Sequence, residues 1–179
     1  VNQMGIWHKS KLLNIPVYIN MASDQLHDIT IVRFIKSLLA ENHIDPNLFG
    51  VEITEDVFID KEGLVIQTLK ELKQLGILTA IDDFGSGQAG VNYLTNFEVD
   101  LVKIGKDVAD KYLLAEKKIV YQTAVKLCES LGFEVLAEGI ETIDQINLLK
   151  EMAVDLVQGY YFYKPMNAKH IKDVMTKNK

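Results

Sequence analysis

Residues 78–87 read Leu-Thr-Ala-Ile-Asp-Asp-Phe-Gly-Ser-Gly, a short apolar run that ends in two aspartates and a glycine-containing turn. Apolar and β-branched residues in succession are typical of a buried strand, so we predict a strand over residues 78–82. The polar residues after it allow two interpretations. Asp82 and Asp83 form either a simple turn before a helix or the acidic part of a functional site.

The same apolar pattern recurs along the chain. It predicts six strands, over residues 15–19, 50–54, 78–82, 101–104, 133–137 and 154–158. Between the strands, apolar residues follow helical spacing, and the predicted buried faces carry Ile31, Ile35 and Leu38, then Val65, Leu69 and Leu72, then Ile119, Val120, Ala124 and Leu127. Repeated strand–helix alternation predicts an α/β fold with parallel strands.

Two architectures fit this alternation, an open doubly wound sheet and a closed (β/α)₈ barrel. No Gly-x-Gly-x-x-Gly turn follows the first strand, which argues against the dinucleotide-binding version of the open sheet. Six polar residues lie at or just beyond the ends of six strands: Asn20, Glu52, Asp82, Lys103, Glu138 and Gln158. Because a barrel brings these ends to one mouth, we predict a TIM-like barrel. Eight strands are needed, so we expect either that the two N-terminal strands lie outside this chain or that another segment closes the gap.

Composition limits the classes of function. The chain has 179 residues and is 48% hydrophobic, which predicts one domain over residues 1–179. Its net charge of −6 argues against binding to DNA or RNA polymers, which requires clustered Lys and Arg. The single cysteine, Cys128, lies in an apolar helical run and predicts a buried thiol in a reducing, cytoplasmic setting. No apolar run reaches the length of a membrane span.

The predicted mouth gathers oxygen ligands. Its carboxylates and amides come from Glu52, Asp82, Asp83, Glu138, Asn20 and Gln158. Hard cations such as Mg²⁺ or Mn²⁺ prefer oxygen ligands, and two such ions can clamp the attacking and leaving oxygens of a phosphodiester. Lys103 would add a positive charge near the phosphate. On these residues alone, another metal-dependent barrel enzyme stays open as an alternative.

Seven motifs resemble those of the EAL domain family, in the family's order and over nearly the whole chain. They lie at residues 19–23 (Ile-Asn-Met-Ala-Ser), 52–55 (Glu-Ile-Thr-Glu), 80–87 (Ala-Ile-Asp-Asp-Phe-Gly-Ser-Gly), 99–104 (Val-Asp-Leu-Val-Lys-Ile), 137–142 (Ala-Glu-Gly-Ile-Glu-Thr), 158–161 (Gln-Gly-Tyr-Tyr) and 164–166 (Lys-Pro-Met). The resemblance implies a TIM-like barrel that binds cyclic-di-GMP and hydrolyses it to linear pGpG with two Mg²⁺ or Mn²⁺ ions. It also implies a homodimer and further signalling domains in the same protein.

The resemblance assigns a role to each motif residue. It implies that Asn20, Glu52 and Asp82 bind the first metal ion and that Asp82 and Asp83 bind the second.

For the catalytic residues, the resemblance implies that Lys103 orients the attacking water. Glu138 would act as the base or support the metal ligands, and Gln158 would support the water network. Glu55 would brace the loop after Asp83.

Three departures from the family pattern predict weak or absent hydrolysis. The segment with the glutamate of the Glu-Ala-Leu signature is not in this sequence, and Gly105 stands where the family places an aspartate. Residues 88–91 read Gln-Ala-Gly-Val where the family usually has Tyr-Ser-Ser-Leu. A domain that binds cyclic-di-GMP without cutting it, or a protein-binding scaffold, therefore stays open as an alternative.

Overall fold

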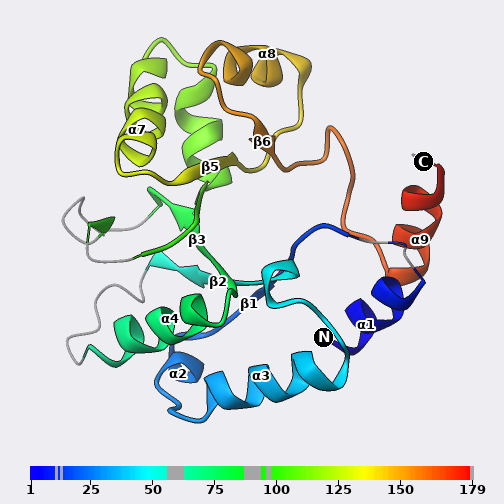
Figure 1. The fold of residues 1–179 in the computed structure, drawn as a ribbon. Helices are drawn as coiled ribbons and strands as arrows, with labels where there is room; N and C mark the ends of the chain where they lie inside the picture. Colours follow the sequence, from blue (N-terminus) through cyan, green and yellow to red (C-terminus); the bar gives the residue numbers. More distant parts are fainter. Residues whose placement is uncertain (11, 13, 56–62, 87–93, 96–97, 178–179) are drawn as a thin grey trace.

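The computed structural model describes residues 1–10, 12, 14–55, 63–86, 94–95 and 98–177. It contains one curled sheet of parallel strands, with helices around it (Figure 1). The strands are β1 (Val17–Asn20), β2 (Phe49–Thr54), β3 (Leu78–Phe84), β4 (Leu101–Ile104), β5 (Glu134–Ala137) and β6 (Leu156–Val157). The helices are α1 (Asn2–Lys9), α2 (Ser23–Leu26), α3 (Ile31–Glu41), α4 (Leu64–Gln74), α6 (Lys106–Val108), α7 (Lys118–Ser130), α8 (Ile143–Glu151) and α9 (Ala168–Lys177), with single turns η1 (Pro46–Leu48) and η3 (Ala109–Leu113).

The order of the strands distinguishes the two architectures. The strands lie side by side in chain order, from β1 to β6, and every neighbouring pair is parallel. A doubly wound sheet would reverse its order at a switch point, whereas a barrel adds each strand on the same side of the last. The sheet therefore has the winding of a TIM-like barrel, as predicted. Within the described residues, β1 and β6 are its two edges.

The core lies between the convex face of the sheet and the helices outside it. The middle strands contribute Val51, Ile53, Ile81, Val102 and Ile104, none of which exposes any surface. Strands of a parallel sheet covered by helices are buried along most of their length, which explains their nearly continuous apolar runs. In the part of the chain that the structure describes, no helix is long and apolar enough to cross a membrane.

The strand boundaries differ from the predicted ones by more than one residue in three strands. Strand β1 begins at Val17, directly after Pro16, which has no N–H to donate to a ladder. Strand β3 continues past Asp82 to Phe84, because Phe84 still pairs with β4. Strand β6 has only two residues, since the backbone N–H of Val154 donates to Leu149 O at the end of α8.

The predicted buried face of α7 was wrong for Ile119 and Val120, whereas Ala124 and Leu127 are partly buried against the core. Ile119 and Val120 are 61% and 42% exposed, whereas Tyr121, Val125 and Cys128 are buried. These three residues follow the same helical spacing, so periodicity alone could not select between the two stripes. Packing decides the face, because Tyr121 is the largest fully buried side chain of the described residues. Cys128 is buried as predicted, and its burial raises the pKa of the thiol to about 12.

Candidate active site at the carboxyl ends of the strands

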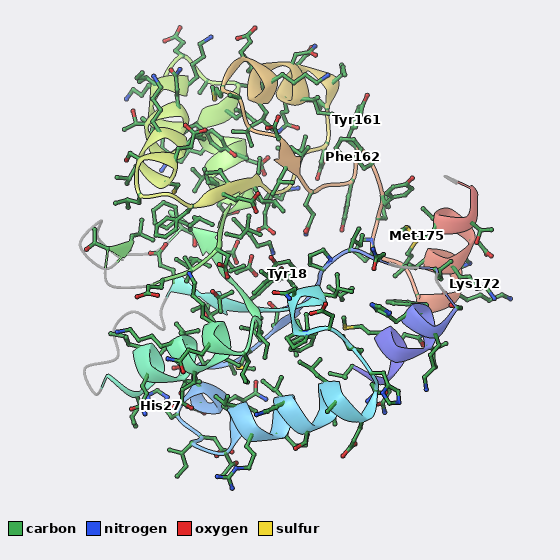
Figure 2. All side chains as sticks on the ribbon, viewed as in Figure 1. Tyr18, His27, Tyr161, Phe162, Lys172 and Met175 are labelled. Atoms are coloured by element: carbon green, nitrogen blue, oxygen red, sulfur yellow. The ribbon has the colours of Figure 1, made fainter. Side chains whose placement is uncertain are left out.

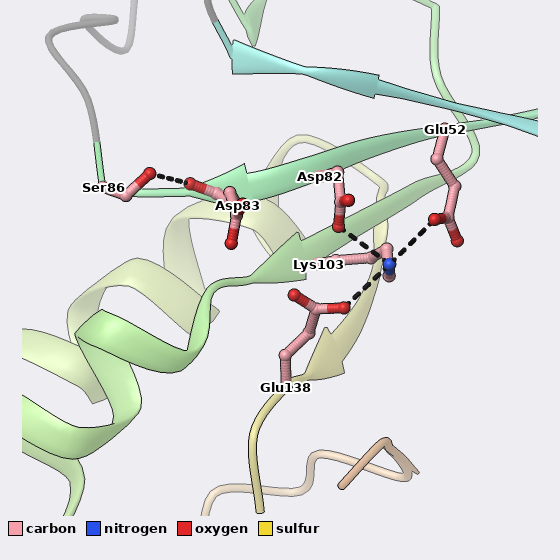
Figure 3. A network of polar contacts seen from close by, with 6 residues as sticks. All are labelled: Glu52, Asp82, Asp83, Ser86, Lys103 and Glu138. Carbon is pink, nitrogen blue, oxygen red and sulfur yellow. Dashed lines mark hydrogen bonds and ion pairs between the residues drawn. The ribbon is translucent and has the colours of Figure 1, made fainter. Parts of the chain in front are cut away.

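Lys103 is the centre of a polar cluster at the mouth of the sheet. Its Nζ lies 2.7 Å from Glu138 Oε1, 2.8 Å from Asp82 Oδ1 and 3.1 Å from Glu52 Oε2 (Figure 3). These four side chains come from β2, β3, β4 and the end of β5, and they are only 4% to 17% exposed. An ammonium has three N–H groups, so the three carboxylates can take up all of them. The predicted convergence of these four residues is confirmed.

A bulge in β3 presents two consecutive aspartates to the mouth. Ile81 pairs with Val102 and Phe84 pairs with Ile104, so two residues of β3 lie opposite one residue of β4. In a regular strand, neighbouring side chains point to opposite faces, and only one aspartate of the pair could face the mouth. The extra residue of a bulge re-aims the side chains around it. Asp82 thereby reaches Lys103, and Asp83 lies at the rim of the same site.

Asp83 has an unusual backbone conformation. Its φ is 56°, in the left-handed region that residues other than glycine adopt rarely. The backbone is held there by its carbonyl oxygen, which accepts from Ser86 Oγ at 2.6 Å and from Ser86 N at 3.2 Å. Partial burial, together with the neighbouring charge of Asp82, raises the pKa of Asp83. Such strained residues often occur at functional sites, where surrounding contacts maintain them.

Glu55, at the end of β2, holds the turn after Asp83 through its side chain. Its carboxylate is buried, and Oε2 accepts from Gly85 N at 2.9 Å. A buried carboxylate that binds a backbone N–H makes a strong, charge-assisted hydrogen bond. The structure therefore places Glu55 where it can hold this turn. The altered segment 88–91 lies outside the described residues.

The cluster carries more negative than positive charge. Burial works against the charged form of Lys103, but hydrogen bonds to Asp82 and Glu138 outweigh it and raise the lysine pKa. Burial also raises the pKa of Glu138, although Lys103 opposes this shift. Four carboxylates, with Asp83 included, thus share a single ammonium group. Carboxylates crowded in this way need a cation or a proton to remain together.

The remaining two predicted residues lie at the two edges of the sheet. Asn20 ends β1 and is the register partner of Glu52, which places it beside the cluster. Gln158 directly follows β6, where its backbone N–H donates to Ala137 O at 2.9 Å. Both side chains are exposed. Asn20 and Gln158 thus lie at the same mouth, but they are not among the three ion-pair partners of Lys103.

The donors at this mouth fit a hard divalent cation in kind and in charge. They are oxygen atoms only, and their negative charges exceed the charge of Lys103. Yet no three His, Cys, Asp or Glu side chains of the described residues are close enough together to hold a metal ion. The reason is that Lys103 Nζ lies between the carboxylates. A cation would therefore have to draw Glu52 and Asp82 away from the lysine.

A cavity of about 890 Å³ opens beside the cluster, between β1 and the end of the chain. Its lining includes Glu138 and Gln158 together with the aromatic and apolar side chains of Tyr18, Tyr160, Tyr163 and Met175. Figure 2 shows Met175 on α9, beside this opening. Helix α9 is therefore not solvated on all sides, because its inner face lines this cavity. Ile171 and Val174 also line the cavity, and their helical spacing with Met175 was the signal that could have revealed it.

Comparison with known proteins agrees with this geometry. The family model described as EAL domain matches residues 1–165. Cyclic di-GMP phosphodiesterase PdeR of Escherichia coli is 30% identical over 169 residues, which is 94% of this chain and 25% of that protein. The chain spans about a fifth to a quarter of the length of curated relatives such as this one and the signaling protein YkoW of Bacillus subtilis.

Solved structures give the same result. The EAL domain of Mycobacterium smegmatis DcpA has a TM-score of 0.93 at 24% identity, over 99% of this chain and 81% of that one, so it shows the shared fold. Klebsiella pneumoniae BlrP1, solved as a complex with calcium and cyclic-di-GMP, has a TM-score of 0.80 at 30% identity, over 92% of this chain and 41% of that one. The motifs, the winding of the sheet and the family match lead to one conclusion: this chain belongs to the EAL domain family.

Proposed function

We propose that this domain binds cyclic-di-GMP and hydrolyses it to linear pGpG with Mg²⁺ or Mn²⁺, at a reduced rate. The observation that carries the proposal is the contact of Lys103 with three carboxylates at the mouth of the sheet. Relatives named as cyclic di-GMP phosphodiesterases, such as PdeR, support the choice of substrate. The adjoining cavity of about 890 Å³, lined by aromatic side chains, has a volume typical of small-molecule sites.

In the proposed site, Asn20, Glu52 and Asp82 would hold one divalent cation, and Asp82 and Asp83 would hold a second. The cations would supply positive charge to the phosphate and lower the pKa of a bound water. Their binding would also change what Lys103 can do. Once the oxygens of Glu52 and Asp82 turn away, the lysine regains N–H groups that can donate to the attacking water or to a phosphate oxygen.

The reaction forms one bond and breaks one bond. The water oxygen bonds to phosphorus and the bond from phosphorus to the 3′ oxygen breaks. The 3′ oxygen takes up a proton from solvent, and the ring opens to a linear dinucleotide. Glu138 would accept the proton of the water, since burial raises its pKa and makes it a better base. Gln158 would hold water at the cavity entrance, and Glu55 would keep Asp83 in place through Gly85.

A second candidate function follows from Gly105, which supplies no carboxylate at the end of β4. Losing one carboxylate near catalytic metal ions costs a rate factor of about 10²–10⁴. The domain would then act as a cyclic-di-GMP receptor, or as a scaffold for protein partners. The proposal also includes a cytoplasmic location, a homodimer and further signalling domains in the complete protein.

Turnover of cyclic-di-GMP with Mn²⁺ tests the proposal, with the domain in its natural full-length context. We expect slow formation of pGpG that disappears in Lys103→Ala and Glu52→Ala, while Lys126→Ala on the exposed side of α7 stays active. Turnover that survives either of the first two changes would contradict the mechanism. A domain that binds cyclic-di-GMP in the presence of Ca²⁺ but does not hydrolyse it with Mn²⁺ would favour the receptor function. A domain that does not bind cyclic-di-GMP at all would favour the scaffold function.

A further inference from the structure

Lys103 holds together carboxylates that the proposed metal ions would also need. Its Nζ lies between 2.7 and 3.1 Å from oxygens of Glu52, Asp82 and Glu138 (Figure 3). Lys103 belongs to β4, and its side chain reaches past β3 to contact Glu52 on β2. Glu52 and Asp82 are also proposed ligands of a divalent cation. The ammonium and the metal ion would therefore use the same two side chains.

The two cations would repel each other in this site. A metal ion bound by Glu52 and Asp82 would lie beside Lys103 Nζ, because Nζ contacts both carboxylates. The side chains of the cluster are only 4% to 17% exposed, so water screens the repulsion between the two charges poorly. With the lysine in this position, no three His, Cys, Asp or Glu side chains of the described residues are close enough together to hold a metal ion.

Lys103 can release two of its partners without a shift of β4. The lysine side chain is a flexible stem of four carbons, whereas β4 is buried along its whole length. The closest partner is Glu138, at 2.7 Å, and Glu138 is not a proposed metal ligand. The ammonium can thus stay with Glu138 when Glu52 and Asp82 turn towards a metal ion.

We propose that Lys103 sets the metal affinity of this site, as a built-in counter-ion of its carboxylates. Without metal, the ammonium keeps the carboxylates together. When a divalent cation binds, the same ammonium opposes it and weakens the binding. Gly105 increases this effect, because it adds no carboxylate at the end of β4 to offset the lysine charge. The inference rests on the proposed function for the identity of the metal ligands, and this role is separate from orienting the attacking water.

Calorimetric titration of the full chain with Mn²⁺ at pH 7.5 tests the proposal. A charge within about 4–6 Å changes the proton affinity of a carboxylate by about 10- to 1,000-fold, and Mn²⁺ carries twice the charge of a proton. We therefore expect Lys103→Met to bind Mn²⁺ at least about 10-fold more tightly than wild type. Because Lys103→Met removes a buried ion-pair partner and loses stability, Lys103→Gln is the second variant. It is also neutral, but its amide keeps N–H groups that donate to the carboxylates.

The sign of the change separates this role from a merely structural one. A lysine that only supports the site would leave a looser site behind, so its removal would weaken Mn²⁺ binding and turnover together. We expect Lys103→Met to bind Mn²⁺ more tightly and yet lose turnover. Mn²⁺ should also raise the urea midpoint of Lys103→Met more than that of wild type, since an ion that binds the folded form stabilises it.

Lys106→Met is the matched control, because it also removes one positive charge at the rim. Lys106 is half-exposed and pairs with Glu141, which is not a proposed metal ligand. Its replacement should change Mn²⁺ affinity by less than about 2-fold, since water and salt screen an exposed charge.

Equal or weaker Mn²⁺ binding in both Lys103 variants would overturn the inference and leave the proposed function standing. An equal gain in Lys106→Met would overturn it as well, because the effect would then come from net charge alone. If the Lys103 variants bound Mn²⁺ and wild type did not, the inference would hold and the proposed metal-dependent hydrolysis would fail. If no protein of the series bound Mn²⁺, both would fail.

Discussion

Replacing Lys103 with methionine removes the only positive charge that contacts Glu52, Asp82 and Glu138 among the described residues. Methionine has a similar length and no charge, so packing changes little. The lysine side chain is 4% exposed and its partners at most 17%, which means that solvent cannot take over its role. The carboxylates left behind can reduce their repulsion by binding a proton. Glu138 is the first candidate, because burial already raises its pKa.

The free energy needed to protonate Glu138 sets the size of the expected stability loss. The ordinary pKa of Glu138 is 4.5, so at pH 7.5 its protonation costs about 4 kcal/mol, at about 1.36 kcal/mol for each pH unit. This agrees with the loss of about 3–5 kcal/mol seen when one partner of a buried ion pair is removed. At pH 5.5 the same step costs about 1.4 kcal/mol. The folded variant holds a proton that the unfolded chain has lost, so its deficit grows as pH rises.

Urea unfolding followed by circular dichroism at pH 7.5 and 5.5 measures this deficit. We expect Lys103→Met to lose about 4 kcal/mol at the higher pH and about 1–2 kcal/mol at the lower one. Lys106→Met is a matched control, because Lys106 is exposed at the same rim and pairs with the half-exposed Glu141. It should change stability little at either pH. A Lys103→Met protein as stable as wild type at pH 7.5, or a deficit that does not shrink at pH 5.5, would refute the reasoning.

Three further outcomes are expected. Glu55→Ala removes the carboxylate that accepts from Gly85 N and should lower the free energy of unfolding by about 1–3 kcal/mol, measured by urea titration. An unchanged midpoint would show that Glu55 does not stabilise the turn after Asp83. Cys128, whose pKa is raised to about 12, should resist a thiol reagent at pH 8 in the folded protein and react in urea, and stability should fall as pH rises above the ordinary value of 9.0. Mn²⁺ should raise the thermal midpoint of wild type at pH 7.5 but not that of a Glu52→Gln, Asp82→Asn double variant; equal shifts in both proteins would place the ion elsewhere.

The chemical character of the site was readable from the sequence because strand periodicity is local. Apolar runs predicted every strand, and a polar residue at the end of each run predicted the shared mouth that Glu52, Lys103 and Glu138 now form. Parallel strands of a barrel open their carboxyl ends to one side, so spacing along the chain was enough to predict which residues converge. The motif resemblance added the family, which the family match confirms.

Other features depend on contacts between distant segments, which no local pattern encodes. The buried face of α7 was set by where Tyr121 packs, and the inner face of α9 by a cavity that includes Tyr18 of β1. The bulge at Asp83 arises from the pairing of β3 with β4, and only this pairing shows that Gly105 lies against the Asp83 carboxylate. The sequence by itself determined the order of strands and the kind of side chains at the mouth. The tertiary structure alone decided which of them touch, because those distances are fixed by strand register and packing across the fold.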